Sequence, residues 1–362
     1  MQFSGILELD PKQHGFIRQP SMTFAETRED VLVPAALIEQ HRLREGLLLE
    51  GTAIEAPKGP AVATTIEAAA GMPLEEWKKV KEFSKHAAVS PHELLRLEGP
   101  KNGNPMRIID LFCPVGKGQR ALIVSPPKAG KTILMGQMAH AISANHPEIE
   151  LLVMLIDERP EEVTDMRRTI KGEVFASSND SDKGRHTRLA QLVLEYAKRK
   201  VETGKDVVIL LDSLTRLGRA FNSSQKGSGR TLSGGVDIRA LEIPKRIFGA
   251  ARKCEDSGSL TIIATALIET NSRMDELIFQ EFKGTGNMEL VLDRDLANER
   301  IFPSINLTAS GTRREELLFG ADVAEHQALR RSLSKQSPRD AMLSVLKLTR
   351  QFPSNEKLLS KF

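Results

Sequence analysis

The segment Ser125–Thr132 (SPPKAGKT) constrains the fold of this 362-residue chain more than any other part of the sequence. Its last three residues match the end of the phosphate-binding motif G-x-x-x-x-G-K-[ST], with a serine in place of the first glycine. The apolar run Ala121–Val124 precedes it and a predicted helix, Thr132–Ala144, follows, an order that disfavours the alternative of an ordinary helix start. Because backbone N–H groups at a helix N-terminus bind phosphate oxygens, we expect Lys131 to reach the β- and γ-phosphates of a nucleotide and Thr132 to ligate Mg²⁺.

Beyond residue 120 the sequence alternates between short apolar runs and amphipathic segments. In residues 188–201 apolar side chains recur at helical spacing, and Gly204 follows as a residue typical of a helix C-terminus. Continuous apolar runs suit strands that are buried on both faces of a parallel sheet. The runs that we predict as strands are Ala121–Val124, Leu151–Ile156, Val207–Leu211 and Leu260–Ala266. The alternation predicts an α/β domain with a mainly parallel sheet.

Carboxylates follow two of these predicted strands. Asp212 ends the run 207–211 in the pattern of the Walker-B motif, whose aspartate supports Mg²⁺; the alternative is a cap for the next helix. The joint occurrence with the phosphate loop favours the metal role. Ligands of open parallel sheets bind beyond the carboxyl ends of the strands, so we expect Glu158 to polarise an attacking water. For Glu161 and Glu162 we favour the simpler interpretation of acidic residues at a helix N-terminus.

Hydrolysis of a nucleotide also requires positive charge on the transition state, which a neighbouring subunit can supply as an arginine finger. The segment Ser310–Glu316 carries the candidate, Arg313. From the residues alone, this segment could equally be the charged N-terminus of a helix.

The chain divides by composition into three parts. Residues 1–75 contain short apolar runs separated by Gly and Pro, a pattern typical of a small all-β barrel. Residues 76–105 are predicted to be a helical connector that ends in the linker Gly99–Pro105. Residues 106–362 are predicted to be the nucleotide-binding α/β domain with further helices at its end.

Composition excludes several classes of protein. The 51 Lys and Arg against 48 Asp and Glu give a net charge of +3, and only 4% of the residues are aromatic, which argues weakly against a protein that simply coats nucleic acid. The apolar runs are too short to cross a bilayer and no secretion signal is visible, so we expect no membrane partner. Two distant cysteines, Cys113 and Cys254, fit a reducing cytoplasm. The histidine and cysteine spacings do not suggest a structural zinc site.

From Asp110 to about Glu316 the chain closely resembles the Rho family of transcription termination factors, which are ring-shaped, RNA-dependent ATPases and RNA–DNA helicases. The resemblance implies a RecA-like ATPase domain, ATP and Mg²⁺ as cofactors, a homohexameric ring, and single-stranded RNA and the RNA polymerase elongation complex as partners. The matching runs are Pro126–Thr132, Leu155–Thr164, Lys171–Ala176, Val208–Arg216, Gly234–Asp237, Gly249–Arg252, Ser259–Ile268, Phe282–Leu290 and Ser310–Leu317.

The resemblance assigns roles in the ATP site. Glu158 resembles the catalytic glutamate, Arg313 the arginine finger, and Arg300 a further arginine at the subunit junction. Arg159 corresponds to a position in the interior of the pocket, and Phe302 to the phenylalanine that stacks on adenine. Lys131 and Asp212 keep the catalytic and metal-supporting roles derived above. The nucleotide contacts implied by the resemblance are Lys128, Ala129, Gly130, Lys131, Thr132, Ile133, Arg159 and Phe302.

Members of this family draw RNA through the ring with two loops. Gln225–Gly235 corresponds to the first loop and Thr270–Met274 to the second. The family often has lysine where this chain has Arg230 and Arg273, and arginine still binds phosphate. The pore contacts that the resemblance implies are Arg230, Thr231, Gly234, Gly235 and Arg273.

The N-terminal part resembles the OB-fold, or cold-shock-like, RNA-binding domain of the family less closely. Phe16 and Arg18 are the expected primary RNA contacts, with core packing as the alternative for Phe16. His14 stands in place of a usual phenylalanine, Leu32 in place of a tyrosine, and 58–64 lack an expected aromatic residue. Since bases gain about 1–3 kcal/mol each from aromatic stacking, weaker or altered binding is expected. The helical subdomain that usually precedes this domain in the family has no counterpart in the sequence.

Two other functions remain open on sequence grounds. The first is a RecA-like rotary or secretion-type ATPase that acts on protein, which the OB-like domain and the Gly-rich loop with Arg230 disfavour. The second is a non-catalytic RNA-binding regulator, which the complete set of predicted catalytic residues disfavours.

Overall fold

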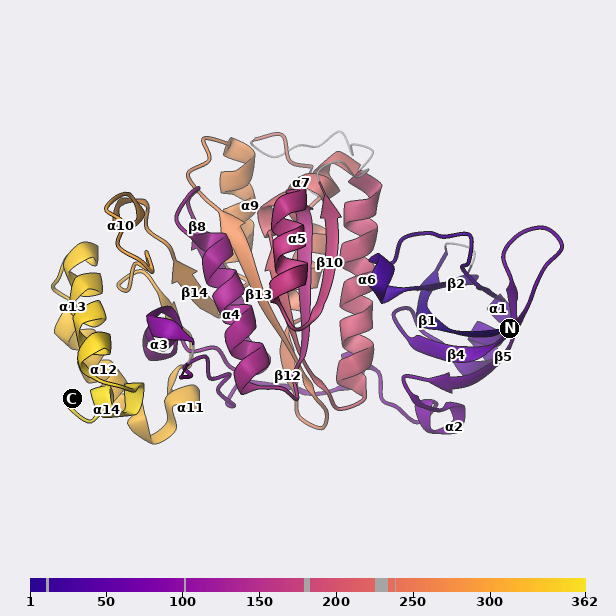
Figure 1. Ribbon diagram of the computed structural model, residues 1–362, viewed down its shortest axis with the longest axis horizontal. Coiled ribbons are helices and arrows are strands. Elements are labelled where there is room, and N and C mark those ends of the chain that lie inside the picture. Colours follow the sequence, from indigo (N-terminus) through magenta and orange to yellow (C-terminus); the bar gives the residue numbers. More distant parts are fainter. Residues whose placement is uncertain (11–12, 101, 179–182, 225–233, 238) are drawn as a thin grey trace.

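The computed structural model describes residues 1–10, 13–100, 102–178, 183–224, 234–237 and 239–362. A small β-barrel lies at one end of the molecule, a large mainly parallel sheet flanked by helices forms the middle, and a group of helices at the C-terminus forms the other end (Figure 1). The two chain ends are therefore far apart (Figure 1).

The N-terminal barrel has the strand order β3-β2-β1-β4-β5-β6, and a parallel pairing of β3 with β5 at Leu32 and Val62 closes it. The other pairings are antiparallel. Gly51 is required where β4 and β5 meet, because a Cβ there would lie 2.2 Å from the carbonyl oxygen of Thr65. The elements are β1 Gln2–Leu9, β2 Gly15–Arg18, the 3₁₀ helix η1 Pro20–Met22, β3 Leu32–Val33, α1 Ala35–His41, β4 Leu48–Ile54, β5 Val62–Ala69, β6 Met72–Pro73 and α2 Leu74–Trp77.

The central sheet has the order β10-β9-β11-β13-β8-β14-β15. All neighbours from β10 to β14 are parallel, and only β15 and the side strands β12 and β7 pair antiparallel. The prediction of a mainly parallel sheet is confirmed, and each predicted strand is longer by one or two residues at each end. The strands are β7 Ala88–Val89, β8 Arg120–Ser125, β9 Glu150–Glu158, β10 Glu173–Ser178, β11 Asp206–Asp212, β12 Arg252–Cys254, β13 Ser259–Leu267, β14 Met288–Val291 and β15 Gly311–Thr312.

Helices cover both faces of this sheet, which explains why its strands are apolar throughout. In β11, Val208 and Leu210 pack into one core with α3, α4, α5 and the C-terminal helices, whereas Val207, Ile209 and Leu211 pack into the other with α6–α9. In the part of the chain that the structure describes, no helix combines the length and apolarity needed to cross a membrane. The helices are α3 Gly103–Phe112, α4 Lys131–Asn145, α5 Pro160–Thr169, α6 Lys183–Glu202, α7 Leu214–Ser224, α8 Glu242–Gly249, α9 Arg273–Lys283, α10 Arg294–Asn298, α11 Glu316–Phe319, α12 Val323–Leu333, α13 Pro338–Gln351, α14 Asn355–Leu359, and the 3₁₀ helices η2 Phe83–Lys85 and η3 Gly320–Asp322.

The connector differs from the helix that its composition predicts. Residues 78–100 contain only the 3₁₀ turn η2, the short strand β7 and extended chain. The reason is tertiary packing: β7 pairs with β12 of the large sheet, and Leu95 and Leu97 are fully buried in the hydrophobic core on one face of that sheet. The helix α3 begins at Gly103, inside the predicted linker. The domain boundaries at 75 and 105 stay predictions.

The barrel is docked on the large domain through an aromatic side chain. Phe24, from the segment between β2 and β3, is 1% exposed and stacks on Phe175 of β10 at 4.9 Å between ring centroids. The ring of Tyr196 from α6 packs edge-on against both. Beside them, Arg188 of α6 forms an ion pair with Glu8 of β1. Side chains of the barrel are thus part of the core that covers one face of the central sheet.

Candidate nucleotide site and nucleic-acid-binding cleft

The phosphate loop joins β8 to α4 in a conformation that only a few residues can adopt. Gly130 precedes α4 with φ +87°, and Lys128 also has a positive φ of +67°. The carbonyl oxygen of Ala129 accepts a hydrogen bond of 2.7 Å from Ser304 Oγ, and this bond anchors the loop to the segment that follows Phe302. The first N–H groups of a helix have no partner within the helix. The loop therefore presents backbone donors and the side chains of Lys128, Lys131 and Thr132 to a phosphate chain.

Three predicted residues converge at the carboxyl ends of β8, β9 and β11. Lys131 Nζ donates hydrogen bonds to both carboxylate oxygens of Asp212 and lies 3.7 Å from Glu158 Oε1. Asp212 is 1% exposed and also accepts a hydrogen bond of 2.8 Å from Thr265 Oγ1 on β13. Adjacent parallel strands end at one edge of the sheet, which explains how residues that lie far apart in the sequence meet here.

Glu158 lies in an environment that disfavours its charge. It is 2% exposed, and burial raises its pKa to about 7, with repulsion from Asp212 as the next cause. The cations of Lys131 and Arg216 oppose this rise without cancelling it. Glu158 Oε1 is buried and accepts no hydrogen bond from any residue in the described ranges. A buried carboxylate with a free acceptor and a pKa near neutrality has the properties of a general base waiting for a water molecule.

The side chains around the loop fit a magnesium ion that is held jointly with phosphates. Thr132 Oγ1 donates a long hydrogen bond of 3.4 Å to Glu162 Oε2, and Asp212 completes the polar surroundings. Within the described ranges no group of three or more His, Cys, Asp or Glu side chains is arranged to hold a metal by itself. Mg²⁺ is commonly bound by one or two side chains together with nucleotide phosphates and water, so the donor set fits it. Glu162 lies in the first turn of α5, as predicted, and in addition reaches this site.

An apolar pocket lies beside the loop. It has a volume of about 250 Å³, and Phe302 and Ile133 stand at its mouth with 47% and 70% of their surface exposed. A Cβ on Gly130 would lie 3.5 Å from the Phe302 ring, so the ring lies directly over the phosphate loop. A pocket lined by these exposed apolar side chains beside the phosphate loop is suited to a flat ring. The further lining residues are Pro105, Ala129, Leu134, Gln137, Leu292, Pro303 and Ser304.

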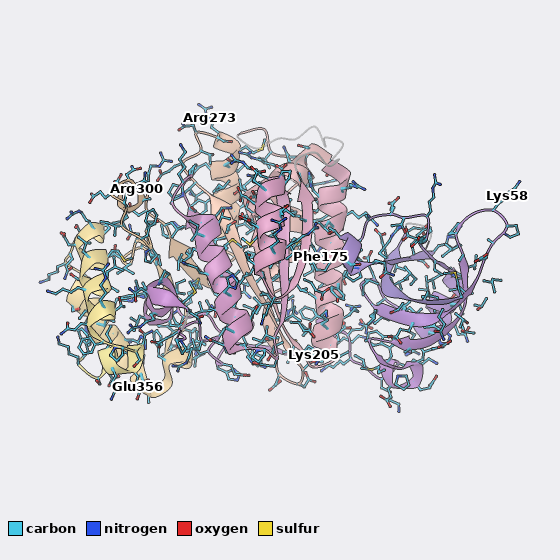
Figure 2. All side chains as sticks on the ribbon, viewed as in Figure 1. Lys58, Phe175, Lys205, Arg273, Arg300 and Glu356 are labelled. Atoms are coloured by element: carbon cyan, nitrogen blue, oxygen red, sulfur yellow. The ribbon has the colours of Figure 1, made fainter. Side chains whose placement is uncertain are left out.

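The three predicted arginines are exposed, and Arg313 lies far from the phosphate loop of its own chain. Arg159 and Arg300 are exposed, the latter at the surface near α10 (Figure 2). Arg313 is also exposed and follows β15 at the edge of the sheet; its N–H donates to Asn287 O, and that residue donates to Arg120 O. Arg313 is therefore level with the start of β8, whereas the phosphate loop follows the end of that strand, five residues later or about 16 Å along the strands.

Of the first predicted pore loop, Gln225–Gly235, only Gly234 and Gly235 are described, whereas the second loop, Thr270–Met274, is described throughout. Arg230 and Thr231 lie outside the described residues. Gly234 and Gly235 both have positive φ, and a Cβ on Gly234 would lie 3.0 Å from the backbone of Arg273, so the ends of the two loops touch. Arg273 is the first residue of α9 and projects from the top of the molecule (Figure 2), so the predicted loop Thr270–Met274 runs into the first turn of a helix.

The barrel carries a cleft of about 700 Å³ on the surface formed by β1, β2 and the following segment. Phe16 is half-buried and lines this cleft instead of joining the barrel core, with Leu32 as its cross-strand neighbour. Arg18 lies 5.0 Å from the centre of the Phe16 ring. The lining residues are Glu8, Leu9, Asp10, Phe16, Arg18, Glu26, Thr27, Arg28, Asp30, Gly59 and Pro60.

Arg18 is not a free cation. Its side chain is 8% exposed and forms ion pairs with Glu8 and Asp30, which are themselves buried. Glu8 is shared with Arg188 of α6. The cleft is therefore a compensated ionic cluster beside one aromatic ring, in which Arg28 and Glu26 are the exposed charges. It differs from a simple basic groove.

Two residues of the candidate nucleotide site were not anticipated from the sequence. Arg216 of α7 lies with Nε 3.2 Å from Glu158 Oε1 and donates to the carbonyl oxygen of Asp157. Thr265 fixes Asp212 from β13. The signal for Arg216 was its place one turn into the helix after Asp212, but the sequence does not show which strand that helix turn faces.

Comparison with known proteins identifies both parts of the chain. Residues 3–65 match the family model described as Rho termination factor, RNA-binding domain, and residues 105–312 match the ATP synthase alpha/beta family, nucleotide-binding domain. A transcription termination factor Rho from Streptomyces coelicolor is 49% identical over 357 residues, covering 98% of this chain and 84% of the relative. The Rho of Aquifex aeolicus is 48% identical over 362 residues, covering 98% of this chain and 83% of the relative.

The fold is also found in solved structures. A structure described as a prototypical ATPase from the type III secretion system of pathogenic bacteria aligns with a TM-score of 0.58 and 23% identity, covering 68% of this chain and 69% of its own. That likeness concerns the fold alone. The identity along almost the whole length and the two matching domains show that this chain belongs to the transcription termination factor Rho family.

Proposed function

We propose that this chain is the subunit of a homohexameric, ATP-driven ring that binds nascent single-stranded RNA, moves along it as an RNA–DNA helicase, and terminates transcription by dissociating the RNA polymerase elongation complex. The observation that carries the proposal is the convergence of Lys131, Glu158 and Asp212 at one edge of the sheet in a chain whose barrel matches the RNA-binding domain of Rho. Relatives named Rho support the same conclusion over nearly the whole chain. A cytoplasmic location is part of the proposal.

In the proposed mechanism of hydrolysis, each residue of the site has a separate role. Lys131 turns from Asp212 toward the β- and γ-phosphates, and Glu158 accepts a proton from the attacking water once that lysine has moved. Asp212 and Thr132 are the residues that would hold Mg²⁺, which would neutralise charge on the phosphates. Phe302 and Ile133 sandwich the base. Arg216 keeps the end of β9 and the Glu158 carboxylate in place.

The position of Arg313 supports a ring. This arginine lies at the opposite end of the sheet from its own phosphate loop, so in its proposed role as an arginine finger it would act on a nucleotide held by a neighbouring chain. Contacts of this head-to-tail kind generate rings when the rotation closes. Arg300, exposed near α10, is assigned to the same subunit junction.

The barrel cleft is assigned to primary RNA binding, with Phe16 as the stacking platform. A single aromatic ring and a neutralised arginine should bind RNA more weakly than a cleft with several aromatic residues, because each stacked base is worth about 1–3 kcal/mol. The loop ends at Gly234, Gly235 and Arg273 are assigned to RNA in the centre of the ring, together with Arg230 and Thr231.

The test is ATP hydrolysis by the full chain against a panel of RNA homopolymers, with Phe16→Ala and Glu158→Gln beside the wild type. We expect RNA to stimulate the wild type, Phe16→Ala to require more RNA for half-maximal stimulation, and Glu158→Gln to be inactive with every RNA. Arg18→Ala is a poor probe, because it would leave the buried carboxylates of Glu8 and Asp30 unpaired. Turnover that no RNA changes would instead favour an ATPase that acts on protein, and absence of phosphate release would favour a non-catalytic regulator.

A further inference from the structure

Helix α7 begins two residues after Asp212 and carries three polar side chains at intervals of three residues, Arg216, Arg219 and Asn222. This spacing places them on successive turns of one side of the helix. The helix lies at the end of the sheet from which Arg273 also projects (Figures 1 and 2). Each of the three side chains is bonded to a different part of the molecule.

The first turn of α7 is fixed to the catalytic strand end. Arg216 donates to the carbonyl oxygen of Asp157, and its Nε lies 3.2 Å from Glu158 Oε1. In the same turn Thr215 Oγ1 accepts a hydrogen bond of 2.9 Å from the N–H of Leu267, at the end of β13. Any displacement of this turn therefore moves the partner of the Glu158 carboxylate.

The second turn is fixed to the predicted second RNA loop. Arg219 binds Asp275 with two parallel hydrogen bonds, of which Nε to Oδ1 is 2.7 Å long. The Asp275 side chain is 1% exposed, and its Oδ2 also accepts a hydrogen bond of 2.6 Å from Thr270 Oγ1. The buried Asp275 carboxylate, in the first turn of α9, thus joins α7 to Thr270 in the middle of the short segment between β13 and α9. The last turn adds Asn222 Nδ2, which donates to Gly235 O at 3.2 Å.

Between these points α7 is packed tightly on the sheet and lies in close contact with α9. Leu214, Leu217 and Phe221 are at most 2% exposed and anchor the helix on the sheet. Gly218, between the two arginines, lets α9 approach so closely that a Cβ there would lie 3.1 Å from Ile278 Cδ1. A shift of the start of α9 is therefore passed to α7 by direct contact as well as through the ion pair.

We propose that Arg219 is a positioning residue that couples RNA in the second loop to the catalytic carboxylate: the Arg219–Asp275 pair transmits the position of Thr270–Met274 through α7 to Arg216 and Glu158. The inference rests on the proposed function, since it assigns how RNA stimulates hydrolysis at that site. Arg219 touches neither the phosphate loop nor Glu158 among the contacts described here, so its effect should appear in the response to RNA.

The test compares Arg219→Gln, Arg219→Lys and Asp275→Asn with a matched control, Lys245→Gln, which removes the ion pair between Lys245 of α8 and Glu281 at the far end of α9. For each variant, kcat and KM for ATP are measured without RNA and with saturating poly(rC), and binding of a fluorescent oligo(rC) is measured by anisotropy. Arg219→Lys keeps the charge but loses the two-point contact. It guards against the chance that Arg219→Gln fails to fold around the buried carboxylate.

For Arg219→Gln and Asp275→Asn we expect the rate without RNA to stay within about twofold of the wild type and the RNA-stimulated kcat to fall about tenfold, a coupling of ordinary size. The RNA-stimulated kcat of Arg219→Lys should lie between the values of these two variants and of the wild type. RNA should stimulate Lys245→Gln as strongly as it stimulates the wild type. If RNA stimulates the Arg219 and Asp275 variants as strongly as it stimulates the wild type, the coupling is overturned and the proposed function is not. An equal fall of both rates, which indicates a structural role, would also overturn the coupling. Wild-type turnover that ignores RNA would overturn the proposed function and the coupling with it.

Discussion

Glu158→Gln should abolish hydrolysis and, at the same time, stabilise the folded chain above neutral pH. Burial and the neighbouring Asp212 raise the pKa of Glu158 from 4.5 to about 7. Between these two pH values the folded protein retains a proton that the unfolded chain has released. The free energy of unfolding contributed by this carboxyl group therefore falls as pH rises from about 4.5 to 7 and stays low above that. The difference between the two pKa values corresponds to a loss of about 3 kcal/mol in the free energy of unfolding, and most of this loss occurs between pH 5 and 8.

The measurement is urea unfolding of the wild type and of Glu158→Gln at pH 5 and at pH 8, with Glu162→Gln as a control from the same site. Stability of Glu158→Gln relative to the wild type should increase by about 2–3 kcal/mol between the two pH values, because glutamine carries no charge that the site must bury. In parallel, kcat/KM of the wild type should fall about tenfold per pH unit on the acid side of pH 7. A stability difference that is the same at both pH values, or larger at pH 5, would refute the reasoning.

Three further outcomes follow from the structure. Lys131→Ala and Arg313→Ala should each be inactive alone, but a mixture of the two should regain activity at junctions that combine an intact phosphate loop with an intact Arg313; a mixture as inactive as its components would remove Arg313 from a role in trans. Phe302→Ala should raise KM for ATP about tenfold, as expected for about 1–2 kcal/mol of stacking, with kcat little changed, whereas Phe302→Tyr should retain a near-normal KM; equal KM in all three proteins would show that the base binds elsewhere. Phe24→Ala should lower the free energy of unfolding by about 3–5 kcal/mol, as for other buried aromatic residues, and calorimetry that shows an unchanged transition would contradict its place in the core.

The strands and the phosphate loop could be predicted because local signals agree with the tertiary structure there. The runs at 121–124 and 207–211 are apolar on every residue, and the structure buries both of their faces. Gly130 and Lys131 lie between a strand and a helix, as the motif requires. Lys131, Glu158 and Asp212 could be brought together in advance because all three follow parallel strands.

Prediction failed where tertiary contacts override local preference or where a partner comes from elsewhere in the fold. The connector was expected to be helical, but pairing of β7 with β12 and burial of Leu95 and Leu97 hold it extended. The contact of Arg18 with RNA stays a prediction, but its ion pairs with Glu8 and Asp30 were not foreseen, because no local pattern identifies these partners. The contact of Arg219 with Asp275 joins residues 56 positions apart and was equally invisible.

The docking of Phe24 has a consequence for how this kind of protein can be cut or recombined. The two family models end and begin at residues 65 and 105, which suggests modules that could be exchanged. The core does not divide there, because Ile6 and Phe24 belong to the hydrophobic cluster of the ATPase domain. Removal of the barrel would leave Phe175 and Tyr196 uncovered and the remaining chain prone to aggregation. A barrel from another protein could replace this one only if it placed an aromatic side chain against Phe175 and Tyr196, as Phe24 does.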